Sequence, residues 1–598
     1  MERSLAIIGA GLSGLIACKY VVEKGFTPVV FEAKEGVGGV WNHTAETTKL
    51  QNDKESYQFS DFPWPPSVNE VMYPSHNQVL EYIQSYAQHF DLLPYIKFNA
   101  KVLDLDYVSG ESHEEMEAWD LWGGTGEPFN SKGKWHIMVQ NTKSSSIEIF
   151  QFEFVILCIG RFSEVPNIPE FPPNQGPEVF NGKVLHSMDY SAMDDEGAKE
   201  LVKRKRITVI GSMKSAVDIA AECSNVNGLE YPCTMIQRTV HWMLPSANLW
   251  GGVKLSYLYF TRFAELLVHK PGETFLLSIL ATLLSPLRWA ISKFAESYLR
   301  WRLPLKKFDM VPNISFRQDI SSCQIAMLPE KFYEKVEEGS IILKKSQTLS
   351  FCKEGLIING ETQPLKMDIV ILATGYKGDK KLRSMFKSSI LQKHIVGPPT
   401  SIVPLYRQVI HPRIPQLAII GYAEDFSNLL ASELRCQWLT YFLSGKLQLP
   451  SISNMERDVQ MWENNMKLYG GNYFWKSCIG VVNICKIAKS LDTKCSNNRE
   501  KSSLCRSRNK WPCRLQSGHQ FEFVILYIVR FSGVPNIPEF PPNQGPEVFD
   551  GKMMHSMDYS AIDNGMAAKL IIRKRVAIIG SQKSAVDIAT ECANANDK

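Results

Sequence analysis

The stretch LAIIGAGLSGLIACKYVVEKGFTPVVFEA, residues 5–33, decides the fold of this chain. An apolar run that suits a buried strand leads into Gly9-x-Gly11-x-x-Gly14, and a helix-like segment follows. A second apolar run ends at Glu32, at the distance from the turn where such motifs place an acidic residue. Strand, glycine turn, helix, strand and acidic residue in this order predict a dinucleotide-binding unit; a glycine turn in an unrelated α/β protein is the alternative.

Each residue of this motif has a physical task. Gly9 permits the tight turn, Gly11 lets the backbone approach a pyrophosphate, and Gly14 lets the helix pack on the strand. Free N–H groups at the helix N-terminus favour phosphates. We expect Glu32 to bind ribose hydroxyls.

A second glycine cluster follows at once, in AKEGVGGVW, residues 33–41. Glycine has no side chain to hold the backbone away from a ligand. We expect Gly39 and Trp41 to lie close to a bound cofactor; the alternative is a flexible loop.

A second nucleotide turn is predicted in RKRITVIGSMKSAVDIAAE, residues 204–222. Gly211 ends a strand, and Ala216 stands at the third glycine position, where alanine is tolerated. Met213 stands at the second position, where its Cβ limits the approach of backbone to a pyrophosphate, and the charge of Lys214 would offset this in part. The residues expected to contact this dinucleotide are Gly211, Ser212, Lys214 and Ser215.

The strand after this turn, TMIQR, residues 234–238, ends at Arg238. An arginine at this strand end is where the 2′-phosphate of NADP would lie. An ordinary arginine at a strand end is an equal alternative.

Apolar runs that suit strands recur between positions 1 and 488, separated by helix-like segments. Continuous apolar strands followed by helices are typical of a parallel sheet covered on both faces. We therefore predict an α/β fold with two nested dinucleotide-binding, Rossmann-like domains. The strands are expected at 5–9, 27–32, 154–160, 206–211, 234–238, 368–375 and 416–421.

Composition excludes several classes of protein. A chain of 598 residues with 44% hydrophobic and 21% charged residues is globular, neither disordered nor fibrous. A net charge of +4 does not indicate a nucleic-acid partner. The 13 cysteines include no Cys-x-x-Cys, which argues against a zinc ribbon or a redox dithiol, and we expect no metal site.

The N-terminus enters an apolar run at Leu5 without a basic segment or a cleavage site. It therefore predicts no signal peptide and a reducing compartment. We expect a cytoplasmic protein, with the surface of the endoplasmic reticulum as the alternative.

The most apolar later stretch is FLLSILATLLSPLRWA, residues 275–290. Pro286 and Arg288 are expected to break it after about a dozen residues, which is short of the roughly 20 that span a bilayer. We predict a buried helix and no transmembrane segment; an interfacial helix in peripheral contact with a membrane is the alternative.

Part of the chain is repeated. Residues 151–229 align without a gap with 520–598, and 56 of 79 positions are identical. The intervening 489–520 is rich in Ser, Asn, Lys and Arg and reads as a linker. We interpret the second copy as a partial duplication that binds nothing by itself, since one strand, turn and helix cannot close a dinucleotide crevice.

Just before the second nucleotide turn, FNGKVLHSMDY fits Phe-x-Gly-x-x-x-His-x-x-x-Tyr from Phe180 to Tyr190. This string resembles the signature of flavin-containing monooxygenases; related Baeyer–Villiger enzymes carry tryptophan at the last position. ILATGYKGD, with Thr374 and Gly375, resembles the Ala-Thr-Gly-Tyr element of the same family. LQNDKESYQFSDFPWP resembles its early loop and places Asn52 where the family keeps an asparagine near the flavin.

Finer features, GSMKSAVDIA, QRTVHW and ATGYKGDKKLRSMF, resemble the plant branch that N-hydroxylates small amines or amino acids. The resemblance implies FAD, NADPH and O2, with oxygen passed through a C4a-hydroperoxyflavin to a soft nucleophile, most simply a nitrogen. It assigns Asn52 a catalytic contact, with a plain turn residue as the alternative, and treats His186 and Tyr190 as supports. It leaves an S-oxygenating enzyme, an auxin-forming enzyme and an inactive relative open, and it says nothing of the oligomeric state.

The motifs, the repeat and the composition together divide the chain, and the resemblance implies an altered C-terminal tail after about residue 484. The predicted parts are an FAD-binding domain at 1–175 and 330–488, an NADPH-binding domain with a helical insertion at 176–329, a linker at 489–520, and a truncated duplicate of 152–229 at 521–598.

Overall fold

A computed structural model describes residues 3–476 except 69, 130–131, 260, 398–400 and 426, together with the strands 523–526, 552–555 and 576–579. The chain divides into two units, 1–499 and 500–598. The predicted linker, the altered tail and most of the predicted duplicate lie outside the described residues.

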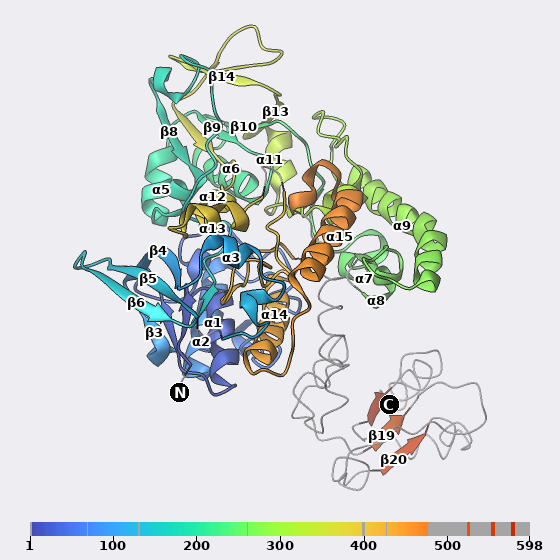
Figure 1. Ribbon diagram of the computed structural model, residues 1–598. Coiled ribbons are helices and arrows are strands. Elements are labelled where there is room, and N and C mark those ends of the chain that lie inside the picture. The colour runs from blue at the N-terminus through green and yellow to red at the C-terminus, as the bar shows by residue number, and fades with distance from the viewer. Residues whose placement is uncertain are drawn as a thin grey trace. The chain divides into compact units, whose positions relative to one another are not determined.

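The first sheet is formed as predicted around the opening stretch (Figure 1). Its order is β18-β7-β1-β2-β3 and every pairing is parallel, with Leu5 of β1 beside Pro28 of β2 and Phe154 of β7. Central strands with all residues buried explain the continuous apolar runs. The strands are β1 Leu5–Ile8, β2 Pro28–Phe31, β3 Ile96–Lys97, β7 Phe154–Leu157 and β18 Leu417–Ile419, and helices α1 Leu12–Val22 and α14 Asn428–Leu443 pack together beside them.

An antiparallel three-stranded sheet, absent from the predicted strands, is inserted between β3 and β7. It consists of β4 Ala100–Ser109, β5 Gly133–Asn141 and β6 Ile147–Phe152. Phe150 and Phe152 of β6 contact Phe31 at ring-centroid distances of 5.2 and 5.9 Å, so this sheet extends the core of the first one.

The second sheet has the order β13-β10-β9-β17-β8 and is also parallel throughout. Two five-stranded parallel sheets confirm the predicted α/β class. Strands β13 and β17 lie beyond residue 329, so the predicted boundary there cuts through this sheet; β17 pairs on both edges, with β9 and β8, and belongs to it. The strands are β8 Lys183–His186, β9 Ile207–Ile210, β10 Cys233–Gln237, β13 Ile341–Lys345 and β17 Ile369–Leu372.

The apolar stretch at 275 forms part of α9, Phe275–Arg302, a continuous helix of 28 residues. The expected break at Pro286 is wrong, because a proline within a helix removes one backbone hydrogen bond and does not have to end it. The expected burial is also wrong: Phe275 and Leu276 are 78% and 76% exposed. By length and composition, α9 is the one helix in the described part of the chain that could cross a membrane, and only 17% of its apolar window is buried.

In the second unit, β19 Phe523–Leu526, β20 Lys552–His555 and β21 Val576–Ile579 form a parallel sheet in the order β20-β19-β21. In the alignment of the two copies, these strands are the counterparts of β7, β8 and β9. The other residues of the second unit lie outside the described residues.

Candidate functional site

The first glycine turn leaves no room for side chains where the sequence predicts none. Gly9 has φ +100°, and a Cβ there would lie 2.7 Å from the carbonyl oxygen of Cys158. A Cβ on Gly14 would lie 1.8 Å from the Gly9 oxygen, so α1 rests directly on β1. A Cβ on Gly11 would meet nothing of the protein closer than the Cα of Gly39, at 3.4 Å. Gly11 is therefore not required by packing and fits a ligand that approaches the backbone.

The second glycine cluster lies against this turn. The N–H of Gly38 donates to the carbonyl oxygen of Ala10 at 3.2 Å, and Gly39 contacts Gly11. Trp41 packs edge-on against Tyr57 with ring centroids 6.2 Å apart. The structure thus brings Gly11, Gly39 and Trp41 to the carboxyl edge of the first sheet, where ligands of such sheets bind.

Glu32 lies at the end of β2 and is buried. Its two carboxylate oxygens accept hydrogen bonds from the backbone N–H groups of Ala10, at 2.7 Å, and Lys34, at 2.9 Å. These bonds fix the carboxylate beside the glycine turn, and each oxygen keeps acceptor capacity for a ribose hydroxyl.

The helices that follow the two glycine turns both begin without a side-chain cap. The N-cap residues are Gly11 for α1 and Met213 for α6 (Lys214–Asn227), and neither first turn holds an acidic residue. Their first N–H groups remain available as donors at the positive ends of the helix dipoles. Both turns therefore fit the pyrophosphate of a dinucleotide.

The second turn packs as tightly as the first. A Cβ on Gly211 would lie 2.3 Å from the carbonyl oxygen of Ala373, at the end of β17. Thr374 and Gly375 follow there and are fixed by Asn167, whose side-chain amide donates to the Thr374 oxygen at 3.0 Å and whose backbone N–H donates to the Gly375 oxygen at 2.8 Å. The Ala-Thr-Gly-Tyr element thus lies beside the second nucleotide turn, with Gly211.

Lys214 is not a free cation at this turn. Its Nζ lies 2.7 Å from Oδ1 of Asp218, a buried side chain one helical turn further on. Burial raises the pKa of Asp218 to about 6, although Lys214 and a hydrogen bond from Thr48 lower it. The sequence did not reveal this ion pair, and a partial offset of Met213 by the charge of Lys214 stays a prediction. Ser212 and Ser215 lie at the same turn, and Ser215 is exposed.

Arg238 lies directly after β10, at the carboxyl end of the strand next to β9. Its side chain is exposed, and its carbonyl oxygen accepts a hydrogen bond from Gln347 at 2.9 Å. Glu32 at the end of β2 and Arg238 at the end of β10 thus hold equivalent places in the two sheets.

Asn52 is half-buried, in a loop that crosses from the first nucleotide unit to the second. Thr47 donates from its backbone and its hydroxyl to Glu222 of α6, and Thr48 donates to Asp218 of the same helix. Lys49 forms an ion pair of 2.7 Å with Glu330. The sequence did not predict these docking contacts, because no motif relates two residues that are separated by 170 to 281 positions in the chain.

His186 and Tyr190, expected to be structural supports, both lie buried at the second sheet. His186 ends β8, and its Nδ1 accepts a hydrogen bond from the Met188 N–H at the start of α4 (Ser187–Ser191). Burial lowers the pKa of His186, and its ring lies edge-on to Tyr376, with centroids 5.5 Å apart. Tyr190 is buried in the core of the second sheet.

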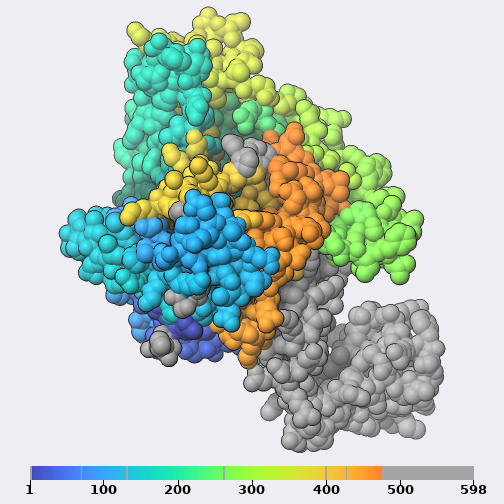
Figure 2. Space-filling view, in the orientation of Figure 1, coloured from blue at the N-terminus to red at the C-terminus, as the bar shows by residue number. Residues whose placement is uncertain are grey.

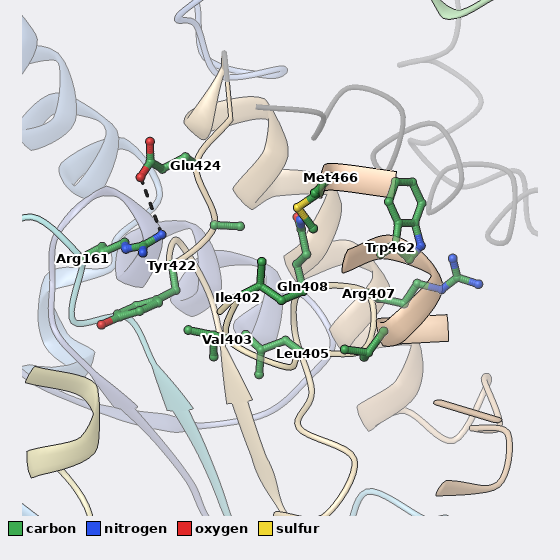
Figure 3. Close-up of a pocket in the computed structure, with 12 residues that line it drawn as sticks. Arg161, Ile402, Val403, Leu405, Arg407, Gln408, Tyr422, Glu424, Trp462 and Met466 are labelled. Atoms are coloured by element: carbon green, nitrogen blue, oxygen red, sulfur yellow. Dashed lines mark ion pairs between the residues drawn. The ribbon is translucent and has the colours of Figure 1, made fainter. Parts of the chain in front are cut away.

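A small cavity of about 50 Å³ opens at the carboxyl ends of β7 and β18 (Figure 3). Arg161, after β7, lies 3.6 Å from Glu424 and 3.7 Å from Asp379. On the wall, Arg407 and Gln408 hold left-handed backbone with φ of 55° and 56°, a costly conformation for two successive residues with side chains. Sequence reasoning did not predict this cavity. Its apolar wall includes Ile402, Val403, Leu405, Val459, Trp462 and Met466.

Residues 2–497 match the family described as flavin-binding monooxygenase-like. "Probable flavin-containing monooxygenase 1" of Arabidopsis thaliana is 41% identical over 483 residues, 80% of this chain and 89% of that protein. "Flavin-containing monooxygenase 3" of Rattus norvegicus is 27% identical over 495 residues, 79% of this chain and 80% of that protein.

Solved structures share the fold. The crystal structure of OTEMO in complex with FAD and NADP aligns with a TM-score of 0.56 and 17% identity, covering 83% of this chain and 98% of that one. Cyclohexanone monooxygenase aligns with a TM-score of 0.55 and 16% identity, covering 82% and 98%. The family match over most of the chain and the Arabidopsis relative together show that this chain belongs to the flavin-containing monooxygenases of the flavin-binding monooxygenase-like family.

Proposed function

We propose that the chain is an NADPH- and O2-dependent monooxygenase that holds FAD at the Gly9–Gly14 turn and NADPH at the Gly211 turn. The observation that carries this assignment is the difference between equivalent strand ends. Glu32 presents a carboxylate, which suits the ribose diol of FAD, and Arg238 presents a guanidinium, which suits the 2′-phosphate of NADPH.

The bound cofactors supply the redox and oxygen chemistry, so the chain needs no nucleophile or general base of its own. The glycine turns and the N-termini of α1 and α6 bind and orient the two pyrophosphates. Asn52, on the loop that docks on α6, is our candidate for an active-site contact, since its amide can both donate and accept. The bonds of Thr47 and Thr48 to Glu222 and Asp218 hold this loop against α6.

We propose the nitrogen of a small amine or amino acid as the oxygen acceptor. The motifs that resemble the plant N-hydroxylating branch support it, and a relative 26% identical over 486 residues is named "Dimethylaniline monooxygenase [N-oxide-forming] 2" of Oryctolagus cuniculus. The cavity beside Arg161 and Glu424 is our candidate for the approach of the substrate, since it lies at the carboxyl edge of the flavin sheet and joins a charged pair to an apolar wall.

The test begins with cofactor binding. The purified full chain is expected to be yellow, to contain one FAD, and to lose its colour when NADPH is added without air. In air, amines should accelerate NADPH oxidation and give hydroxylated nitrogen, and replacing Glu424 by Gln should change KM for the amine and leave KM for NADPH unchanged. Oxidation of a thioether only, or of indole-3-pyruvate only, would contradict the nitrogen assignment. A chain that stays colourless with added FAD would contradict the proposal itself and indicate an inactive relative.

A further inference from the structure

Helix α9 carries an outward stripe of large apolar side chains along its whole length. Members of the stripe recur at intervals of three, four or seven positions, so they fall on one face of the helix. Their exposed fractions run from 37% to 76%, so each leaves part of its apolar surface uncovered by the described part of the chain. The stripe consists of Leu276, Leu280, Leu283, Leu287, Phe294 and Trp301.

The opposite face of α9 is fixed to the body by buried polar groups. Arg288 donates to the hydroxyl of Ser321 at 2.9 Å, and Glu296 and Ser292 accept the N–H groups of Phe316 and Arg317 at 3.1 and 2.9 Å. Separating the helix from the body would leave these groups unpaired. The helix therefore stays on the body with its stripe outward, and this excludes a membrane-spanning orientation.

The exposed apolar surface on the N-terminal half of α9 is wider than the contact stripe by which two helices pair. Phe275, Leu277 and Ile279 flank the stripe and are 78%, 41% and 41% exposed. No charged residue occurs between Glu273 and Arg288. Helices that pair in a coiled coil place charged residues beside the seam, so this surface favours a lipid phase over a second helix.

Two short helices widen the same surface. Helix α8 (Arg262–Leu266) packs beside α9, and α7 (Leu255–Tyr259) packs beside α8. Tyr257, Phe263 and Leu266 of these helices are also exposed. In Figure 2, the green atoms of this region form a lobe at the right-hand edge of the body. So large an exposed apolar patch marks an interaction surface.

The C-terminal half of α9 and the segment after it are basic. Between residues 275 and 307 the sequence has six Lys and Arg and a single acidic residue, Glu296. Arg302 and Lys306 are exposed. Trp301, 66% exposed, has an amphipathic ring that suits the level of lipid headgroups.

We propose that α9, with α7 and α8, lies in the surface of an anionic lipid bilayer, with the leucines of its stripe among the acyl chains and its basic end, with Trp301, at the headgroups. This makes the protein a peripheral membrane enzyme. The proposal does not depend on the substrate, nor on which cofactor occupies each turn.

The experiment is co-sedimentation of the full chain with vesicles of phosphatidylcholine alone or mixed with phosphatidylserine. The wild type should bind the mixed vesicles more tightly. Leu276→Ser with Leu283→Ser should weaken binding roughly tenfold or more, as expected for two leucines that leave an apolar phase. The matched control is Ile147→Ser with Ile149→Ser on β6, which removes two side chains that are 55% and 63% exposed, and it should bind as the wild type does. FAD content and the melting temperature check folding.

A second variant addresses charge. Arg302→Glu with Lys306→Glu should lower the affinity for anionic vesicles by roughly fivefold or more per residue and leave binding to neutral vesicles unchanged. This variant keeps the proposal testable if the leucine variant does not fold. Unchanged vesicle binding in the leucine variant would overturn the proposal. So would a wild type that binds no vesicles but self-associates through the stripe, as light scattering would show.

Discussion

Gly11 and Gly14 belong to one turn, yet an added methyl group would act on them differently. At Gly14 the Cβ would lie 1.8 Å from a backbone oxygen, so α1 would have to move away from β1. We predict that Gly14→Ala lowers the free energy of unfolding of the cofactor-free protein by at least about 2 kcal/mol, as measured by urea denaturation.

At Gly11 the added Cβ meets only the Cα of Gly39, at van der Waals distance. Gly11→Ala should therefore leave the stability of the cofactor-free protein within about 0.5 kcal/mol of the wild type and still lower FAD content after purification. Equal loss of stability in both variants would contradict the ligand role of Gly11.

The side chain of Arg238 allows a similar test of cofactor choice. Removing a guanidinium that binds a phosphate costs about 1.5–3 kcal/mol, a factor of roughly 10–100 in affinity. Arg238→Ala should raise KM for NADPH by that factor and leave KM for NADH nearly unchanged. Lys353→Ala, an exposed cation on the β14–β15 hairpin (Leu349–Cys352 and Gly355–Ile358), is the control and should change neither. An equal change for both nucleotides would remove the 2′-phosphate from the assignment.

At the residue scale, sequence predicted best where backbone geometry allows one residue type. Gly9, Gly14 and Gly211 stand where any side chain would overlap backbone, so their spacing alone located both turns. The partner of Lys214 could not be found in this way. An i,i+4 aspartate on a helix is common, and only tertiary packing shows that Asp218 is buried there.

At the element scale, helix α6 links the second nucleotide turn to the loop that carries Asn52 through Asp218. The raised pKa of this carboxyl, about 6, lies above its value of about 3.9 in the unfolded chain. The stability it contributes is therefore present below about pH 4 and is lost as the pH rises through about 6. The free energy of unfolding falls by about 2–3 kcal/mol over this pH range.

Asp218→Asn should abolish this part of the pH dependence. The difference in free energy of unfolding between variant and wild type should change by about 2–3 kcal/mol between about pH 4 and pH 7, in favour of the variant at the higher pH. Asp195→Asn is the control, since Asp195 pairs with Lys199 at the same i,i+4 spacing on an exposed helix. Parallel profiles for the Asp218 variant and the wild type would contradict the burial argument.

Helices and strands were predicted less accurately than the glycines of the two turns. Apolar runs located seven of the ten strands of the two parallel sheets and missed β3, β8 and β13. The run at 369–372 gave no sign of which sheet it joins, because strand partners are set by tertiary contacts. The prediction that α9 is buried was wrong for a related reason. An apolar helix in a core and one in a lipid surface have the same local composition, and only the surrounding structure distinguishes them.

At the scale of the whole molecule, the repeated FVIL segment shows how far context decides structure. In the first unit, β7 pairs with β1 and β18. In the second unit, the same four letters in β19 lie between β20 and β21, the counterparts of β8 and β9. There β19 takes the place and register that IVIL of β17 has between β8 and β9. In the second unit, β19 thus replaces a counterpart of β17, because the two strands are equally apolar.

This arrangement argues that the second unit adds no cofactor site. Its described strands pair only with each other, and the sequence of residues 500–598 contains no Gly-x-Gly-x-x-Gly. Every residue assigned to a cofactor lies at or before Gly375, the wall of the cavity ends at Met466, and α15 (Ile452–Gly470) ends ahead of the repeat. We predict that a chain ending at residue 488 keeps the FAD content, the NADPH oxidation rate and the melting temperature of the full chain. A chain ending before α15 should lose them, since Trp462 and Met466 would leave the cavity wall. Loss of FAD from the chain that ends at residue 488 would show that the repeat completes the enzyme.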